Sequence, residues 1–322
     1  MESKISEILN EMEDCLTIEQ QKKLQQVLVA KLCENRQRTE PIKNSDYQKL
    51  FLDAKKIEGC SERTLLYYGT TLTHFFGEVT EPMRKISTDR IREYLADYQK
   101  INNCSNATVD NIRRNISSFF SWLEEEDHIL KSPMRRIHKI KSKKQVKEVI
   151  SDEVIEQLRD NCNCKRDLAM IDLLYSTGIR VGELVKLNIS DVNFEERECI
   201  VFGKGDKERR VYFDAKAKLH LQAYLKERND DNPALFVTLD SPHNRLKISG
   251  VEIRLRELGR SLNIDRVHPH KFRRTMATRA IDKGMPIEQV QKILGHSQID
   301  TTMQYAIVNQ NNVKSSHRRF VA

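Results

Sequence analysis

The sequence predicts a predominantly α-helical chain with a small β-sheet, an α+β protein of two domains. Apolar residues recur at helical spacing between residues 41 and 138 without strand-like alternation, which indicates a helical first domain. After Val149 the helical segments are interrupted by short alternating runs, which indicates a mixed second domain. A chain of 322 residues is also long for a single hydrophobic core.

Residues 1–40 are expected to form a helical N-terminal extension. Ile5, Ile8, Leu24 and Leu28 are among its apolar residues at helical spacing. The segment carries eight acidic and six basic residues, a net charge of −2, which disfavours a DNA-binding arm. Such an amphipathic extension packs against a neighbouring domain or serves as a partner helix, and packing is the commoner case.

Four helices are expected in the first domain, residues 41–138. The first contains Tyr47 and Phe51, the second spans Thr64 to Phe76, and the third begins after start signals at residues 87–89. The fourth runs from residue 106 to residue 123 and carries a strong apolar stripe of Val109, Ile112, Ile116, Phe119, Phe120 and Leu123.

A basic segment follows the helical domain, and we call residues 131–147 the basic strap. The strap contains no acidic residue, and its basic residues are Lys131, Arg135, Arg136, Lys139, Lys141, Lys143, Lys144 and Lys147. Such a run is often a solvated linker, and we assign residues 139–148 as the linker between the domains. Its charge also suits a phosphate backbone, to which it would add affinity but no sequence information.

The second domain, residues 149–322, is expected to be mixed. A helix from residue 165 to residue 177 should end at Gly178, which suits a left-handed cap. Short strands are expected at residues 192–194, 199–202 and 209–213, the last two joined by a glycine-containing turn. Two further helices, 269–283 and 286–294, each begin with proline and are followed by Gly284 and Gly295.

Composition limits the possible partners. The net charge of +8 favours a polyanion, while no apolar run approaches the roughly 18 residues that span a bilayer. Because the start of the chain lacks the apolar core of a secretory signal, we expect a cytoplasmic protein without a membrane partner. The seven cysteines are scattered, and Cys162 and Cys164 lack zinc-finger spacing, so reduced thiols without a metal are expected.

Six polar residues recur in order through the second domain and carry the chemistry: Arg180, Lys204, His270, Arg273, His296 and Tyr305. Arginine presents a planar fork of donors to phosphate oxygens and stays protonated. The set therefore suits an anion that gains charge during reaction, such as a phosphodiester. A zinc site of His268, His270 and His296 is the disfavoured alternative, since no carboxylate or thiol pair stands near them in the sequence.

From residue 45 to residue 310 the chain resembles the tyrosine recombinases, the phage integrase family that includes the Xer-type resolvases. The resemblance implies a helical, SAM-like core-binding domain followed by a mixed catalytic domain. It implies DNA breakage and rejoining through a 3′-phosphotyrosyl intermediate and a Holliday junction, with no cofactor. An integrase of a mobile element, active in transposition, and a Xer-like resolvase are both consistent with it.

The resemblance also assigns roles. Tyr305 is the nucleophile, and Arg180 and Arg273 hold the phosphate. Lys204 is the general acid, with Lys207 as the competing candidate. His270 assists proton removal from Tyr305, His296 donates to the phosphate, and Glu183 orients the cluster. Arg274 stands where many relatives have a second histidine. The expected DNA contacts are Arg135, Arg136, Lys139, Lys141, Lys143, Lys144, Lys207, Arg209, Arg210 and Arg274.

The expected partner is a double-stranded recombination site, bound by a homotetramer. A short helix within residues 309–320 would dock in a neighbouring protomer, so that exchanged C-terminal tails close the ring. An accessory DNA-bending or excision factor is a further candidate partner. Two other functions stay open: a type IB topoisomerase-like enzyme that relaxes DNA, and a catalytically silent architectural protein on the same fold.

Overall fold

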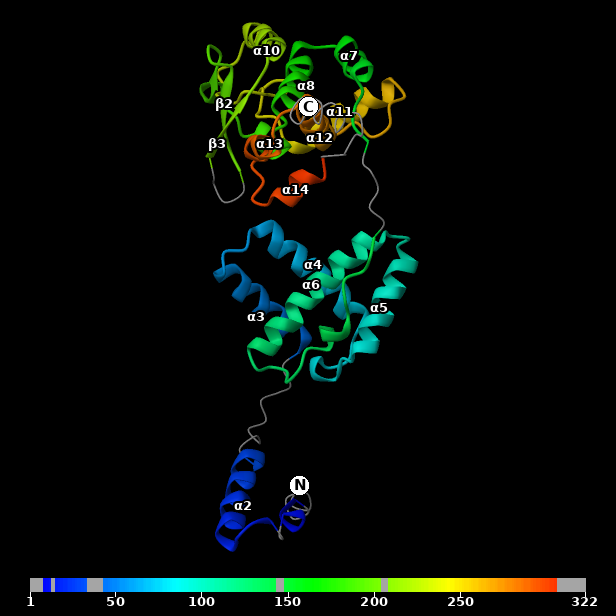
Figure 1. Ribbon diagram of the computed structural model, residues 1–322, viewed down its shortest axis with the longest axis vertical. Helices are drawn as coiled ribbons and strands as arrows, with labels where there is room; N and C mark the ends of the chain where they lie inside the picture. The colour runs from blue at the N-terminus through cyan, green and yellow to red at the C-terminus, as the bar shows by residue number, and fades with distance from the viewer. Residues whose placement is uncertain (1–7, 13–14, 34–42, 143–147, 204–207, 306–322) are drawn as a thin grey trace, which may run out of the picture. The chain divides into compact units, whose positions relative to one another are not determined.

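The computed structural model describes residues 8–12, 15–33, 43–142, 148–203 and 208–305 of the chain (Figure 1). The chain divides into two compact units, Met1–Gln145 and Val146–Ala322. This division falls inside the segment assigned above as a linker. Helices dominate both units, and the second unit contains a three-stranded sheet. The predicted fold class, predominantly α with a small β-sheet, is therefore confirmed.

The first unit contains helix α2 of the N-terminal extension and the four predicted helices. Their bounds are α2 Ile18–Cys33, α3 Asn44–Ile57, α4 Glu62–Glu78, α5 Thr88–Ile101 and α6 Asn106–Glu125, with 3-10 turns η3 Met83–Lys85 and η4 Pro133–Arg136. Ser61, Ser87 and Ser105 each cap a helix by accepting a backbone hydrogen bond. The first backbone N–H groups of a helix have no partner inside the helix, and each serine accepts a hydrogen bond from one of them. The sequence itself therefore sets where these helices begin.

Aromatic side chains form the core of the first unit. Phe51, Phe75, Phe119 and Phe120 are completely buried and meet mostly edge to face, for example Phe51 and Phe119 with ring centroids 5.3 Å apart. Such pairs add to the free energy gained from apolar burial. Because α6 supplies two of these rings, the predicted stripe on this helix is its core-facing side.

The start of the basic strap is attached to the first unit. The backbone N–H of Ile140 donates to Oδ1 of Asp110 at 3.0 Å, and Asn106 donates to the carbonyl of Lys141 at 2.9 Å. Ile137 and Ile140 also pack against the helical core. Residues 137–141 thus lie on α6, although part of this stretch was assigned to the linker from the sequence.

The second unit surrounds a central helix, α8 (Lys165–Thr177). Its other elements are α7 Asp152–Asp160, α9 Val181–Leu184, η5 Ile189–Asp191, β1 Val192–Asn193, β2 Glu198–Phe202, β3 Glu208–Tyr212, α10 Ala215–Glu227, α11 Ile248–Ser261, α12 Pro269–Asp282, α13 Ile287–Leu294 and α14 Ile299–Met303. The strands form an antiparallel sheet in the order β1-β2-β3, with Cys199 opposite Val211. Helix α8 ends at Gly178, whose φ of 61° gives the left-handed cap that was predicted.

Sequence patterns did not reveal α7, α10 and α11. Helix α10 has a usable signal, because Asp214 caps it by accepting from the backbone N–H of Ala217 at 2.8 Å. Its buried face is short, consisting of Ala217, Leu221 and Tyr224. Helix α11 begins after Lys247, which makes no side-chain cap, and so gives no start signal.

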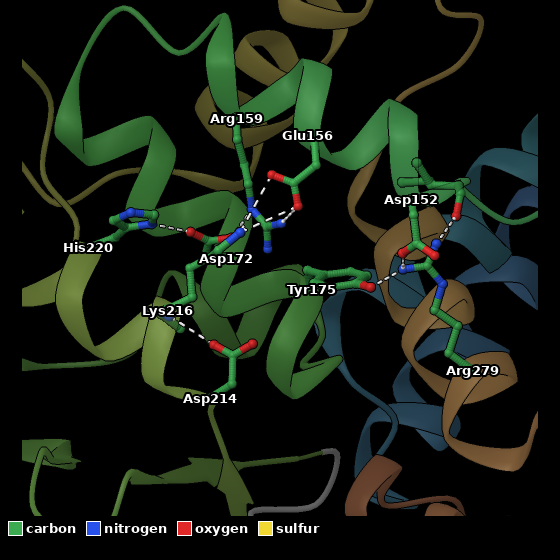
Figure 2. Close-up of polar contacts among 11 residues, drawn as sticks. Asp152, Glu156, Arg159, Asp172, Tyr175, Asp214, Lys216, His220 and Arg279 are labelled. Atoms are coloured by element: carbon green, nitrogen blue, oxygen red, sulfur yellow. Dashed lines mark hydrogen bonds and ion pairs between the residues drawn. The ribbon is translucent and has the colours of Figure 1, made fainter. Parts of the chain in front are cut away.

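A polar network lies along α8 (Figure 2). Asp172 of α8 is 1% exposed and accepts from Nε of Arg159 at 2.6 Å and from Nδ1 of His220. Arg159 also pairs with Glu156. Nearer the end of α8, the hydroxyl of Tyr175 accepts from Arg279 of α12, which pairs with Asp152 as well. This network joins α7, α10 and α12 to the helix that leads into Gly178.

Candidate active site

A buried carboxylate, Glu183, lies at the centre of the candidate site. The backbone N–H of Arg180 donates to its Oε2 at 2.8 Å, and Nη1 of Arg180 donates to its Oε1 at 3.0 Å. Arg209, on β3, donates from Nη1 and Nη2 to the same two oxygens, each at 2.7 Å. Two arginines from separate elements therefore hold one carboxylate whose side chain is 4% exposed.

Glu183 stays ionised in this position. Burial alone would raise its pKa, but the hydrogen bonds from Arg209 and from the backbone and side chain of Arg180 outweigh burial and lower it. Arg180 lies between Ile179 and Val181 in the sequence, but its own side chain is 35% exposed and paired with Glu183.

Arg273 of α12 is the most deeply buried guanidinium of the site, with 2% exposure. Its Nη1 donates to the carbonyl of Gly178 at 2.7 Å and its Nη2 to the carbonyl of Leu294 at 2.6 Å. Nη2 of Arg180 donates to the next carbonyl, that of Gly295, at 3.3 Å. The ends of α8 and α13 therefore orient both arginines, because their last carbonyl groups lack partners inside the helix.

The site carries more positive than negative charge. Burial, followed by the charge of Arg180, lowers the pKa of Arg273 to about 10. Arg180 and Arg209 bind the carboxylate of Glu183, and Arg273 interacts with it only through its charge, so among the described residues three guanidinium groups face one carboxylate. A surplus of buried positive charge is unfavourable unless an anion joins it.

His296 contacts Arg273 through one ring nitrogen and Thr302 through the other. Its Nε2 lies 2.9 Å from Nη2 of Arg273, and its Nδ1 lies 2.9 Å from Oγ1 of Thr302. Since arginine only donates, Nε2 is the acceptor and the ring proton is on Nδ1. Burial, followed by the charges of Arg273 and Arg180, lowers the pKa of His296 to about 4, so the ring is neutral at pH 7.

Tyr305 follows α14 and stacks on His296, with ring centroids 6.1 Å apart and an interplanar angle of 28°. Its ring is half-buried and packs against the cluster of Ala277, Val290 and Leu294. Thr302 accepts from the backbone N–H of Tyr305 at 2.9 Å. Thr302 is fully buried and supports both His296 and Tyr305, and no motif in the sequence singles it out.

Of the residues predicted for catalysis, the structure brings Arg180, Arg273, His296 and Tyr305 together around Glu183. His270 lies at the start of α12, exposed, one turn before Arg273. Lys204 and Lys207 lie outside the described residues. So do Lys143 and Lys144 of the basic strap.

The remaining candidate DNA contacts fall into two groups. Lys139, Lys141 and Arg136 are exposed, as are Arg135, which pairs with Glu124, and Arg210, which pairs with Glu198. Arg209 and Arg274 differ from the expectation. Arg209 directs all three guanidinium nitrogens to protein acceptors, and Nη1 of Arg274 donates to the carbonyl of Glu148 at 2.9 Å.

No group of three or more His, Cys, Asp or Glu side chains among the described residues could hold a metal ion. None of the described helices is both long and apolar enough to cross a membrane.

Comparison with known families matches both units. Residues 136–312 match the phage integrase family, and residues 48–129 match the phage integrase N-terminal SAM-like domain. The chain is 32% identical over 285 residues to tyrosine recombinase XerC of Leptospira interrogans, covering 84% of this chain and 91% of that protein. It is 31% identical over 285 residues to tyrosine recombinase XerA of Pyrococcus horikoshii, covering 86% and 94%.

Solved structures share the fold. The Tn1549 transposon integrase in complex with transposon right end DNA superposes with a TM-score of 0.72 at 19% identity, covering 86% of this chain and 99% of that one. A lambda integrase dimer bound to a core site superposes with a TM-score of 0.70 at 17% identity, covering 88% and 85%. Neither the topoisomerase-like nor the silent architectural alternative is favoured by these comparisons. With the ordered site residues and both matching domains in place, the chain belongs to the phage integrase family, the tyrosine recombinases that cleave and rejoin DNA.

Proposed function

We propose that Arg180 and Arg273 bind the non-bridging oxygens of a scissile phosphate and that Tyr305 attacks its phosphorus atom. The observation that carries this proposal is the charge surplus around Glu183, next to the stacked rings of His296 and Tyr305. A phosphate would supply the missing negative charge. The same guanidinium groups would stabilise the additional charge of the pentacoordinate transition state.

In the proposed cleavage step the phenolic oxygen of Tyr305 forms a bond to phosphorus while the bond to the 5′-oxygen breaks. The phenolic proton passes to His270, and Lys204 donates a proton to the leaving 5′-oxygen. The product is a 3′-phosphotyrosyl ester and a free 5′-hydroxyl. Attack by the 5′-hydroxyl of another strand reverses the step, and two such exchanges pass through a Holliday junction.

His296 must change its hydrogen bonds for its proposed role. Without DNA its Nε2 accepts from Arg273, so this nitrogen has no proton to donate. We propose that a bound phosphate draws the donors of Arg273 to its own oxygens. Its negative charge would also raise the pKa of His296, so that Nε2 gains a proton and donates to the phosphate.

The proposed partner is double-stranded DNA at a recombination site, reached in the cytoplasm. Residues 41–138 would serve as the core-binding domain and residues 149–322 as the catalytic domain. The exposed cations Lys139 and Lys141 support a role for the basic strap in sequence-independent phosphate binding. We also propose a homotetramer joined by exchanged C-terminal tails, although residues 306–322 lie outside the described part, and an accessory DNA-bending or excision factor.

The test is a nicked suicide substrate that traps the covalent intermediate. Wild-type protein should form a denaturant-stable DNA adduct, and Tyr305→Phe should form none while binding DNA nearly as well, because only the attacking oxygen is removed. Tyr212→Phe is the control, since this phenol is 54% exposed on β3 and has no proposed role. An adduct on the Tyr305→Phe protein would refute the assignment.

A further inference from the structure

Arg209 joins three segments of the candidate site. On β3, it donates to both carboxylate oxygens of Glu183 at 2.7 Å, and its Nε donates to the carbonyl of Ile293 at 2.9 Å. A two-pronged pair with a carboxylate fixes the orientation of the carboxylate as well as its position. The additional bond to Ile293 attaches the end of α13 to the same guanidinium.

The turn after α13 is shaped to accept this side chain. Gly295 has φ of 64°, which favours glycine, and a Cβ atom there would lie 3.0 Å from Cδ and 3.1 Å from Nε of Arg209. The absence of a side chain at Gly295 thus lets Arg209 approach the backbone that carries His296.

The groups held by Arg209 in turn hold the two proposed phosphate ligands. Glu183 binds Arg180, and the turn carbonyls of Leu294 and Gly295 accept from Arg273 and Arg180. We infer that Arg209 is a positioning residue for cleavage, which fixes Glu183 and the turn at residues 293–296 so that Arg180 and Arg273 direct donors to one phosphate. This inference rests on the proposed function above.

Two other roles for Arg209 are less consistent with its contacts. A phosphate ligand needs free donors at the surface, whereas this side chain is 12% exposed and each of its nitrogens has a protein acceptor. A purely structural arginine is exemplified by Arg228, which is 6% exposed and pairs with Asp230. The acceptors of Arg228 all lie within residues 230–235, and none of them holds a site residue.

The charges around Glu183 give the inference a specific signature. This carboxylate of α9 faces Arg180, the residue just before the same helix, Arg209 from β3 and the charge of Arg273 from α12. Without Arg209, burial would act against fewer opposing hydrogen bonds, so the pKa of Glu183 would rise. A protonated Glu183 would bind Arg180 more weakly. As the pH is lowered, the variant without Arg209 would therefore lose cleavage activity at a higher pH than the wild type does.

The experiment uses the full chain with a suicide substrate, and compares Arg209→Gln with Arg228→Gln as the matched control for loss of a buried arginine. At saturating protein, Arg209→Gln should cleave roughly 100-fold more slowly, the order expected for a misplaced catalytic group. Its affinity for a half-site should stay within about twofold, and the acid limb of its pH profile should move to higher pH. Arg228→Gln should lower the melting temperature without changing the rate per folded molecule.

Two further variants keep the inference testable if Arg209→Gln folds poorly. Arg209→Lys retains a charge but cannot bridge two oxygens and a carbonyl, so we expect an intermediate rate. In a double-mutant cycle, Arg209→Gln should cost much less when Glu183 is already glutamine. If the two substitutions instead lower the cleavage rate by independent factors that multiply, positioning through Glu183 is contradicted.

Three results would overturn the inference or its basis. Weaker binding with a salt slope flattened by about 0.9, at an unchanged saturated rate, would make Arg209 a phosphate contact. A rate loss matched by Arg228→Gln at equal loss of stability would make its role structural. Failure of the wild-type protein to form any adduct would instead refute the proposed function itself.

Discussion

Two buried carboxylates in the second unit show how the candidate active site differs from a cluster that only stabilises the fold. Glu183 is 4% exposed and Asp172 is 1% exposed, and each is bound by arginine. Arg180 and Arg209 bind Glu183 and the charge of Arg273 also acts on it, while among the described residues none of these arginines pairs with a second carboxylate. Around Asp172 the chain places Arg159, which is also paired with Glu156, and His220 (Figure 2).

The difference lies in charge balance. At Asp172 two carboxylates, Asp172 and Glu156, pair with two cations, Arg159 and Lys216, so the charges compensate one another and the cluster is complete without a ligand. At Glu183 positive charge exceeds negative charge, and the pKa of Arg273 is lowered to about 10 by burial and by Arg180. Burial of charge is tolerated when it is compensated, so the uncompensated cluster is the one that needs an anion.

Deleting the chain after Val308 should produce the largest functional loss, while sparing both clusters. We expect the truncated protein to fold and to bind a single half-site, because every residue of the site up to Tyr305 remains. It should fail to form tetrameric complexes on paired sites and should not recombine them, which gel-shift and recombination assays would measure. Recombination at the full-length rate would disprove tail exchange.

Asp172→Asn should sharpen the contrast, because it should lower the stability of the fold without altering the candidate active site. Loss of the carboxylate leaves Arg159, which is 9% exposed, without its buried partner. We expect a loss of roughly 3–5 kcal/mol in the free energy of unfolding, measured in urea. Glu257→Gln is the control, because Glu257 is 52% exposed in its pair with Arg254 and should cost no more than about 1 kcal/mol. Equal losses of unfolding free energy in the two variants would show that Asp172 stabilises the fold no more than an exposed ion pair does.

The basic strap should give the smallest and least specific effect. Changing Lys141, Lys143 and Lys144 to alanine should weaken binding to specific and random duplexes alike. The slope of log K against log salt should flatten by up to about 0.9 per lost phosphate contact. The control removes three lysines outside the strap and the site: Lys22, Lys23 and Lys226. An unchanged slope in the strap variant would make the strap an inert linker.

The sequence was most informative where local signals decide structure. Apolar spacing located α4 and α6, the start signal at residues 87–89 located α5, and Gly178 marked the end of α8, because these features act within a few residues. Helix α11 was not predicted, because the residue before its start, Lys247, makes no side-chain cap that would indicate where the helix begins. Ordered motifs also named the residues that meet around Glu183.

The partners of individual arginines could not be predicted in the same way. Arg209 and Arg210 are neighbours on β3 and both read as phosphate contacts. Alternation along the strand buries Arg209 against Glu183 and leaves Arg210 62% exposed beside Glu198. Which acceptor an arginine meets depends on contacts between distant segments, such as β3 and the end of α13. The role of Thr302 could not be predicted for the same reason, since it also depends on contacts that form only in the folded chain.

The most direct test of the charge-balance account compares Arg273→Gln with Arg159→Gln on a suicide substrate and in urea. Arg273→Gln should cleave roughly 10²–10³-fold more slowly at saturating protein, as expected for a lost donor to the transition state. Arg159→Gln should lose roughly 3–5 kcal/mol of unfolding free energy but cleave at the wild-type rate per folded molecule. The account would be contradicted if Arg159→Gln slowed cleavage of the folded protein while Arg273→Gln left it unchanged.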